Sequence, residues 1–378
     1  MKIAIFHNLP GGGAKRMVYS LVKELSKSNI IDEFTISTST NYLDTSRYIN
    51  RKKNYYYEQG KGPFRFVLNG LTSLNAVHKK IAEDINREKY DIVFVNHDFI
   101  TKSPYLLRYL KVRSLYFCHE PPREYYEAQN LHSPRLKDKF ANLLRLPFKY
   151  VDRTNFLHSD VVVANSDYSK SIIQRIYKKT PRVIHPGVDI QIFKPHFIKK
   201  KNQIISVGSL LSYKGHTEVI KSLGTINRKK RPKLIIVGNG RKSDEDEIMK
   251  NATKQEVEIK VVNNISDRDL SKLYASSKAV VSLAYGEPFG LSVLEGMACG
   301  IPAIVVNEGG LIEQVKDGEN GYITSRNYKE AGNKIVSAMT HNQSLGKKAR
   351  MIVAKEWTWQ KTIGEINELL NLIVYGKE

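Results

Sequence analysis

Residues 279–302 read AVVSLAYGEPFGLSVLEGMACGIP. The apolar, partly β-branched run Ala279–Leu283 predicts a strand, and the glycines and the proline that follow it predict a loop. The apolar stretch after the loop predicts a helix. A strand that leads through a short loop into a helix is the unit from which parallel α/β sheets are built. These residues therefore favour an α/β fold whose loop lies at the carboxyl end of a strand, where open sheets of this kind bind ligands.

The same alternation of short apolar runs with amphipathic stretches continues in both directions along the chain. It predicts two doubly wound parallel sheets, one in each half. The expected strands of the first half are Lys2–Phe6, Phe34–Ser37, Ile92–Asn96, Ser114–Cys118 and Val161–Ala164. Those of the second half are Gln203–Val207, Lys233–Val237, Ile259–Val262, Ala279–Leu283 and Ala303–Val306.

Length and local composition divide the chain. Its 378 residues exceed what one hydrophobic core usually holds, so we expect two domains. Prolines, a glycine and a lysine run interrupt the pattern between Pro186 and Lys201. We predict Rossmann-like domains over residues 1–190 and 201–355, followed by a C-terminal helix within residues 356–378. The apolar side of that helix would hold Ile363, Ile366, Leu369, Leu370 and Ile373.

The charge of the chain is its unusual property. Sixty lysines and arginines against 38 acidic residues give a formal net charge of +22, with the larger excess in the first half. Such an excess indicates an anionic partner: nucleic acid, a membrane surface or a phosphorylated ligand. The two cysteines, Cys118 and Cys299, are too few for a disulfide framework and suit a reducing cytoplasm. No apolar run reaches the length of a membrane span, so any membrane contact would be peripheral.

Two carboxylates stand out within the quoted stretch. Glu287 lies in the loop after the strand, and Glu295 follows eight residues later, about one turn into the helix. This spacing places Glu287 at the ligand-binding edge of the sheet. The backbone N–H groups at the helix start, around Gly290–Val293, would be free to receive a diphosphate.

The stretch resembles the E-P-F-G-L-x-x-x-E-x-M-A-C-G-x-P block of the family-4 retaining glycosyltransferases of the GT-B fold. The resemblance implies that Glu287 lies beside the transferred sugar and that Glu295 holds the ribose hydroxyls of the nucleotide. It also implies two Rossmann-like doubly wound domains facing across a cleft. The N-terminal domain would bind the acceptor and the C-terminal domain the nucleotide sugar. The helix within residues 356–378 would cross back to the N-terminal domain.

The activity implied by this resemblance is hexosyl transfer with retention of the anomeric configuration. The donor would be a GDP- or UDP-linked sugar, and the acceptor a glycan or a lipid-linked molecule, as in the synthesis of cell-surface polysaccharides or glycolipids. No cofactor and no metal ion are expected, because lysine and helix N-termini replace the ion in this family. Two alternatives remain open: a same-fold enzyme with a small soluble acceptor, of the sugar phosphate synthase type, and a non-catalytic nucleotide-sugar-binding protein.

Further donor contacts follow from the same resemblance. Lys214, in the loop after the first strand of the second half, matches a lysine that holds the donor diphosphate, a role that suits a compact positive charge. Ser209 stands where the family usually has a second cation, an arginine. The remaining expected donor-side residues, beyond Glu295 and Gly290–Ser292, are Gly12, Gly13, Ser209, Gly238, Asn264 and Phe289. For Gly238 a tight turn without ligand contact is an equal alternative.

The glycines after the first strand do not form a dinucleotide fingerprint. The third glycine of that pattern would fall at Arg16, and no acidic residue ends a second strand at the expected distance. In this family they would let the backbone approach the donor or the acceptor, and Lys15 and Arg16 would add positive charge.

His119 ends the expected strand Ser114–Cys118. A neutral imidazole has one donor and one acceptor, which suits contact with sugar hydroxyls or proton movement. We therefore expect His119 to position substrate on the acceptor side. Its alternative is a histidine bonded within a buried turn, and Glu120 and Arg123 stay open between acceptor contacts and a local ion pair.

Other polar clusters are read as structural. Two Asp-x-Asp triplets, Asp244–Asp246 and Asp267–Asp269, do not end core strands, so neither predicts a metal site; Ser266 would cap a helix. Ser166 or Asp167 would cap another helix, Tyr168–Ile176, and the segment His185–Asp189 would lead into the linker.

The excess positive charge favours a membrane surface. The stretch Arg135–Arg153 has apolar and basic residues at helical spacing, although Pro147 is expected to break or kink it. Aromatic and basic residues also gather at Arg51–Tyr57 and Lys61–Phe66. A solvated helix face is the alternative. Nucleic acid is not an expected partner, because the basic run Arg228–Arg231 comes with no nucleic-acid-binding signature.

Overall fold

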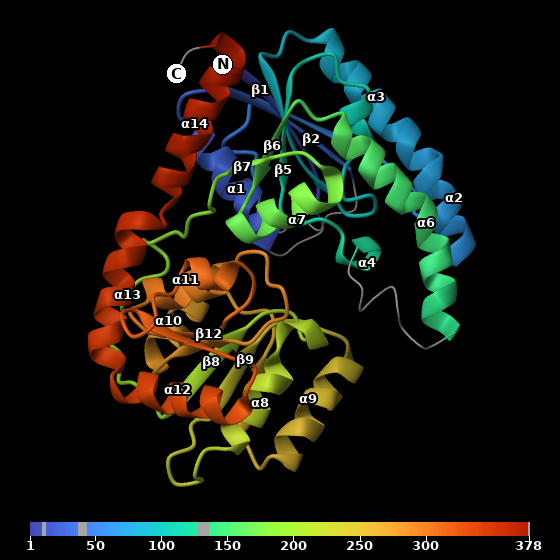
Figure 1. The fold of residues 1–378 in the computed structure, drawn as a ribbon. Helices are drawn as coiled ribbons and strands as arrows, with labels where there is room; N and C mark the ends of the chain where they lie inside the picture. Colours follow the sequence, from blue (N-terminus) through green and yellow to red (C-terminus); the bar gives the residue numbers. More distant parts are fainter. Residues whose placement is uncertain (10–12, 37–43, 127–135, 377–378) are drawn as a thin grey trace. The chain divides into compact units, whose positions relative to one another are not determined.

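The computed structural model describes residues 1–9, 13–36, 44–126 and 136–376. Contacts divide the chain into two compact units (Figure 1). The first unit consists of Met1–His185 together with Thr362–Glu378, and the second unit is Pro186–Lys361.

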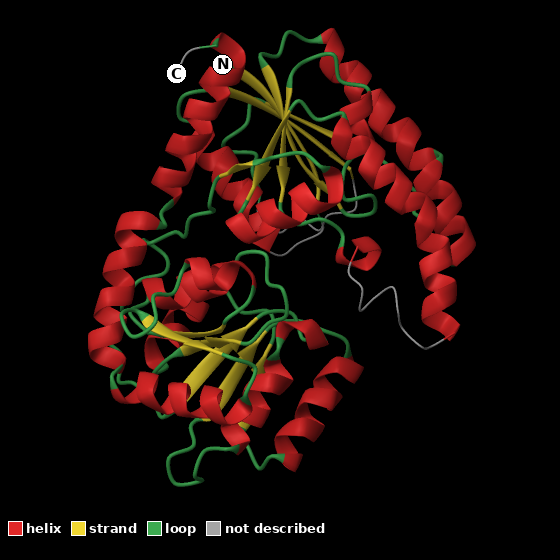
Figure 2. Ribbon diagram, in the orientation of Figure 1, coloured by secondary structure: helices red, strands yellow, loops and turns green. Residues whose placement is uncertain are grey.

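The first unit is built on a parallel sheet with the strand order β3-β2-β1-β4-β5-β6-β7. Helices lie on both sides of its strands (Figure 2). Its strands are β1 Lys2–Asn8, β2 Ile30–Ile36, β3 Arg51–Tyr55, β4 Ile92–Asp98, β5 Ser114–Cys118, β6 Val161–Ala164 and β7 Arg182–Val183. Its helices are α1 Gly13–Leu25, α2 Pro63–Leu71, α3 Ser73–Arg87, η1 Tyr105–Arg108, α4 Arg123–Tyr126, α6 Leu136–Leu157 and α7 Asp167–Tyr177.

The second unit repeats this plan with the strand order β10-β9-β8-β11-β12-β13, again with all neighbours parallel. Its strands are β8 Gln203–Val207, β9 Lys233–Val237, β10 Ile259–Val262, β11 Val280–Ser282, β12 Ala303–Val306 and β13 Gly321–Thr324. Its helices are η2 Ser212–Lys214, α8 His216–Gly224, α9 Lys242–Lys254, α10 Asp267–Ser276, α11 Leu291–Ala298, η3 Gly309–Glu313, α12 Tyr328–Thr340 and α13 Asn342–Glu356.

The strand orders confirm the predicted doubly wound α/β architecture. In each unit the first strand lies in the middle of the sheet, and the order reverses between it and the fourth strand: β1 beside β4, and β8 beside β11. The loops that leave such a pair diverge to opposite faces and open a crevice at the carboxyl ends of the strands. Each unit also has its own cluster of buried apolar residues, as expected for sheets covered on both faces.

The prediction missed three short edge strands, β3, β7 and β13. β3 reads RKKNY, and its residues alternate between exposed and half-buried positions. An edge strand needs no continuous apolar run, so its charge concealed it. Two of the basic residues in the segment Arg51–Tyr57 form ion pairs inside the first unit, Arg51 with Asp32 and Lys52 with Glu33.

The expected break at Pro147 is absent. Helix α6 continues from Leu136 to Leu157 with Pro147 inside it. Pro147 is exposed, while Phe148 and Val151 beside it are buried and hold the helix against its neighbours. Of the predicted basic helix, Arg135 lies outside the described residues.

The C-terminal helix α14, Trp359–Tyr375, begins in the second unit, and its residues from Thr362 onward belong to the first. All five apolar residues predicted for one side are buried. The Thr362 hydroxyl donates to the carbonyl oxygen of His185 at 2.8 Å, and Arg113 donates to the carbonyl of Ile373. Among the described residues, no helix is both long and apolar enough to cross a membrane.

Candidate active site

The two loops at the switch point of the second unit bring Lys214 and Glu287 together. Lys214 ends η2, after β8, and Glu287 follows β11, the neighbouring strand. The Lys214 ammonium donates to Oε2 of Glu287 at 2.7 Å, and their side chains are 24% and 17% exposed. A lysine and a carboxylate predicted separately thus form one partly accessible ion pair at the ligand-binding edge of the sheet.

Gly215 lets these loops approach each other. It has φ +73°, and a Cβ atom there would lie 2.2 Å from the carbonyl oxygen of Leu283. No other residue fits this backbone conformation and this space. One residue beyond the glycine, α8 begins, and on the facing loop Tyr285 N donates to the carbonyl of Tyr213 at 2.8 Å.

Two glycines missed by the sequence analysis support the other side of the Glu287 loop. A Cβ atom on Gly309 would lie 2.5 Å from the Glu287 carbonyl oxygen, and one on Gly310 would lie 2.3 Å from that of Pro288. Gly310 N donates to the Glu287 carbonyl at 2.8 Å. The sequence does contain a signal that could have revealed them, because two consecutive glycines follow the predicted strand Ala303–Val306 and glycines at such a place often mark a close approach of two backbones.

Helix α11 begins after Gly290, whose φ of +96° only glycine adopts readily, and it carries Glu295. The Glu295 side chain is buried at 3% exposure. The hydroxyl of Tyr274, from α10, lies 3.2 Å from Oε2 of Glu295 and 2.9 Å from the Ser292 carbonyl oxygen. The Tyr274 hydroxyl therefore has two acceptors within reach of its one proton and lies beside the second glutamate, a contact that the sequence analysis did not foresee.

Two further loops, after β9 and after β10, lie at the same edge of the second sheet as the loop after β8. A Cβ atom on Gly238 would lie 1.7 Å from the carbonyl oxygen of Gly208, so the loop after β9 needs a glycine to pass Ser209. The Asn239 amide donates to the Asn264 side chain at 3.0 Å, which ties the loop after β9 to the loop after β10. Backbone packing alone thus explains why position 238 is a glycine, and contact of Gly238 with a donor stays a prediction.

His216, at the start of α8, shapes the loop that holds Ser209. Its Nε2 lies 3.3 Å and 3.2 Å from the carbonyl oxygens of Gly208 and Ser209, so Nε2 carries the proton and Nδ1 accepts from the Ser206 hydroxyl at 2.9 Å. Burial lowers the pKa of His216 to about 4. The imidazole is therefore a neutral structural brace near pH 7, and the sequence analysis did not single it out.

Comparison with known proteins agrees with this geometry. The family model of glycosyltransferase family 4 matches residues 11–192, and that of glycosyl transferases group 1 matches residues 188–356. The α-1,3/1,6-mannosyltransferase ALG2 of Dictyostelium discoideum is 23% identical over 98% of both chains. This chain is a glycosyltransferase of family 4.

Two solved structures show that the glycosyltransferase has the GT-B fold. HepE from Anabaena, solved with UDP and glucose, has a TM-score of 0.72 at 19% identity and covers 98% of this chain and 99% of its own. Sucrose-phosphate synthase from Thermosynechococcus elongatus has a TM-score of 0.79 at 18% identity and covers the whole of both chains.

The first unit of the glycosyltransferase places His119 beside a second histidine. His119 follows β5 and His97 lies near the end of the neighbouring strand β4, with ring centroids 5.2 Å apart. Burial lowers the pKa of His119 to about 4 and the pKa of His97 well below its ordinary value. Both rings are therefore neutral near pH 7. Within the described part of the chain neither Nε2 atom has a hydrogen-bond partner.

The glycine loop of the first unit is only partly visible. Gly12 lies outside the described residues, and Gly13 is the exposed first residue of α1. Lys15, two residues further along α1, is buried; its burial and, to a lesser extent, the charge of Lys52 lower its pKa.

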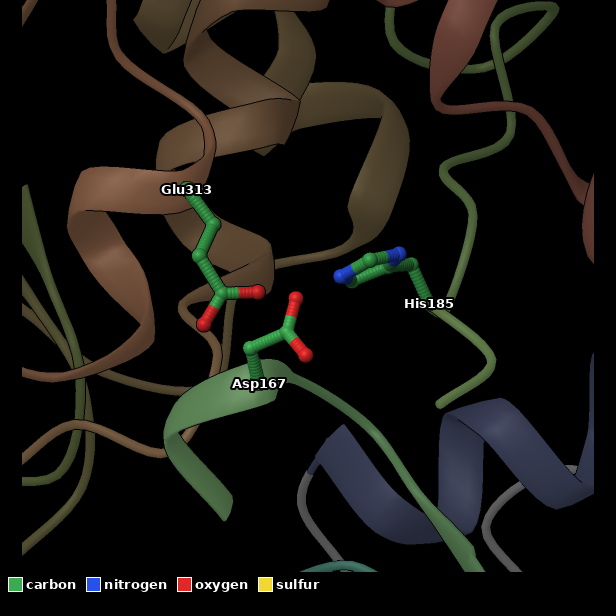
Figure 3. A group of neighbouring side chains, drawn as sticks. All are labelled: Asp167, His185 and Glu313. Carbon is green, nitrogen blue, oxygen red and sulfur yellow. The ribbon is translucent and has the colours of Figure 1, made fainter. Parts of the chain in front are cut away.

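The Asp-x-Asp triplets lie at helix starts. Ser266 caps α10 by accepting from Asp269 N, and Asp244 in the first turn of α9 accepts from Arg241 N. Figure 3 shows Asp167, at the start of α7, and His185, both in the first unit, with ligand atoms within 4.8 Å of each other. Glu313 in the same view belongs to η3 of the second unit. Two groups from one unit are too few for a structural metal site.

Proposed function

We propose that this glycosyltransferase moves a hexose, with retention of the anomeric configuration, from a GDP- or UDP-linked donor to a glycan or lipid-linked acceptor in the synthesis of a cell-surface polysaccharide or glycolipid. The observation that carries the proposal is the Lys214–Glu287 pair at the switch point of the second sheet. The mannosyltransferase relative and the UDP complex of HepE support a nucleotide-sugar donor.

The chemistry assigned to the site separates a leaving group from a sugar. The bond between the anomeric carbon and the diphosphate oxygen breaks, a bond to the acceptor oxygen forms on the same face, and the proton of the acceptor hydroxyl passes to the departing diphosphate. Negative charge grows on the diphosphate as its bond to the sugar breaks. Lys214 would neutralise it, together with the N–H groups at the start of α11, where the helix dipole is positive. No metal ion takes part in this proposal.

The two glutamates have different tasks in this proposal. Glu287 is partly accessible and would orient the transferred sugar. Glu295 is buried next to Tyr274 and would accept from the ribose hydroxyls, a task that suits a fixed carboxylate. With Ser209 in the place of the family's arginine, Lys214 would carry more of the diphosphate charge.

His119 would position the acceptor. A neutral imidazole can both donate to and accept from a sugar hydroxyl, and the low pKa of His119 keeps it neutral at the pH of the cytoplasm.

A membrane surface would present a lipid-linked acceptor. Helices α2 and α6 of the first unit are neighbours, joined by Phe66 and Phe148, whose ring centroids are 5.9 Å apart. Seven exposed side chains of α2, of α6 and of the loop before α2 make up what we call the α2–α6 surface; four are apolar and three are cations: Phe64, Leu68, Leu146, Tyr150, Lys61, Arg65 and Arg153. Phe64 and Tyr150 are 74% and 73% exposed. Exposed aromatic and basic side chains together favour peripheral binding to anionic lipid, here on the cytoplasmic face.

A small soluble acceptor is the second candidate. The likeness to sucrose-phosphate synthase over the whole chain favours it. An enzyme of this kind would transfer sugar to a sugar phosphate in the absence of lipid, whereas the first proposal requires a lipid-linked acceptor or a glycan.

The direct test is release of nucleoside diphosphate from a panel of UDP- and GDP-sugars, with lipid extracts or sugar phosphates as acceptors. We expect one donor to be consumed and Glu287→Gln to reduce that turnover by at least 100-fold while the protein remains folded. Glu313→Gln, on a neighbouring element of the same unit, serves as the control variant. Full activity of Glu287→Gln, or no turnover with any donor, would contradict the proposal.

A further inference from the structure

The loop that carries Glu287 is held by a charged pair from two other loops. Arg326 follows β13 and Glu308 follows β12. The Arg326 guanidinium donates to one Glu308 oxygen through Nε at 2.9 Å and through Nη2 at 2.5 Å. Such a two-point contact fixes the plane of the guanidinium as well as its position.

Both partners also bind the main chain immediately before Glu287. Arg326 donates to the carbonyl oxygens of Leu283 and Ala284 at 3.3 Å and 3.1 Å. Its Cζ atom lies 3.6 Å from the centroid of the Tyr285 ring, a cation–π contact. The other Glu308 oxygen accepts from Gly286 N at 2.6 Å. Four consecutive residues, 283–286, are thus bound by one ion pair.

We propose that Arg326, braced by Glu308, is a positioning residue for Glu287. This inference rests on the proposed function. The pair acts on Glu287 through the backbone that leads into it, at Ala284 and Gly286. Arg326 and Glu308 side chains are 31% and 37% exposed, and pairs with that exposure add little to global stability. Loss of the pair should therefore lower kcat, through the placement of the carboxylate, by more than the accompanying fall in melting temperature explains.

The requirement for arginine is specific. Binding two carbonyls and a carboxylate while stacking on a ring needs a planar group with several fixed donors. A lysine keeps the charge and can reach one or two of these acceptors. It cannot reproduce the stacking on the Tyr285 ring or the paired N–H contacts with Glu308. Arg326→Lys should therefore be intermediate between the wild type and Arg326→Ala.

Steady-state kinetics with the full chain test this inference. We expect Arg326→Ala to lower kcat by about 10- to 100-fold, the range for a carboxylate displaced by about 1 Å, while KM for the donor changes less than threefold. Arg326→Lys should recover part of the lost kcat. The matched control is Arg231→Ala. Arg231 also donates to several backbone carbonyls of the second unit, those of Gly224, Ile226, Gln255 and Glu256. It lies just before β9, however, at the amino ends of the strands and not at the carboxyl ends where Glu287 lies. This variant should lower the melting temperature and leave kcat unchanged.

Amide hydrogen exchange separates this inference from the proposed function. Faster exchange of residues 283–287 in Arg326→Ala, with unchanged exchange in α8 and α12, supports the positioning role even if no nucleotide sugar is turned over. Unchanged exchange overturns it. A kcat within twofold of the wild type, or a loss of kcat matched by a fall in melting temperature as large as that of Arg231→Ala, also overturns it.

Discussion

The ammonium of Lys214 and the carboxylate of Glu287 lie 2.7 Å apart, although 73 positions separate them in the sequence. Each comes from the loop after one strand of the central pair β8 and β11. A bound diphosphate would compete with Glu287 for the same ammonium. Donor binding in our proposal therefore exchanges one anionic partner of Lys214 for another and frees Glu287 to face the sugar.

Removing the charge of Lys214 should impair turnover more than it impairs folding. We expect Lys214→Met to lower kcat/KM for the donor by about 100- to 1,000-fold, the cost of losing one donor to a developing negative charge. The control is Lys233→Met, because Lys233 makes a comparable contact of 2.6 Å with Glu258 away from the site. Equal activities of the two variants would refute the assignment of Lys214.

Tyr274 should affect nucleotide affinity. Tyr274→Phe keeps the ring and removes the hydroxyl that lies 3.2 Å from Glu295. A lost hydrogen bond costs about 1 kcal/mol, so the Kd for UDP or GDP should rise by about fivefold in calorimetric titration. Tyr322→Phe, on β13 of the same unit, should leave the Kd unchanged. A Kd for Tyr274→Phe equal to that of the wild type would show that Glu295 does not depend on this hydroxyl.

The pKa of His216 predicts a pH dependence of stability. Its folded-state pKa of about 4 lies below the value of about 6.5 expected in the unfolded chain. Protons therefore bind the unfolded state preferentially. The contribution of neutral His216 to the free energy of unfolding is thus complete above pH 6.5 and is lost as the pH falls toward 4. By linkage it amounts to about 2 kcal/mol between pH 7 and pH 5.

Denaturant unfolding at pH 7 and pH 5 measures this effect. His216→Gln lacks the titrating group, so its loss of unfolding free energy between the two pH values should be smaller than that of the wild type by about 2 kcal/mol. His119 has a similarly low pKa in both proteins, so the comparison cancels its contribution. Parallel pH curves for the two proteins would disprove the role of His216.

The α2–α6 surface should bind anionic vesicles. We expect the wild type to sediment with vesicles containing phosphatidylglycerol and to be released by salt, because exposed cations interact through screened charge. Phe64→Ser combined with Tyr150→Ser should weaken this binding. Met351→Ser removes a 62% exposed apolar side chain from α13 of the second unit and serves as the control. Vesicle binding that is unaffected both by salt and by the double substitution of Phe64 and Tyr150 would rule out this surface as the membrane contact.

The sequence predicted the central strands well, and it singled out two residues that the structure brings together, Lys214 and Glu287. Continuous apolar runs such as Lys233–Val237 and Ala303–Val306 appear as strands with the expected bounds, because strands buried on both faces need apolar residues throughout. Lys214 and Glu287 were recognised separately from their local motifs. Their contact confirms that loops from neighbouring parallel strands meet at one edge.

Partners that act across long sequence separations were not predictable. Nothing near Glu308 or Arg326 in the sequence indicates that they bind the backbone around Tyr285, because that contact exists only once β11, β12 and β13 are aligned. Tyr274 lay on an ordinary amphipathic helix. His97 was not singled out because it lies at the end of an apolar run that reads simply as a strand. Strand β3 was missed because its sequence is mostly charged.

Helix α14 determines which of the two units has its complete sequence first during synthesis on the ribosome. The second unit is one continuous segment, so its whole sequence has been synthesised once Lys361 is added. Translation of the first unit begins earlier, but this unit lacks Ile366 and Leu370, both fully buried, until synthesis has passed the whole second unit. The half of the protein that is made first is therefore the half that finishes folding last, and a ribosome that stops before Thr362 releases a chain whose second unit alone has its complete sequence.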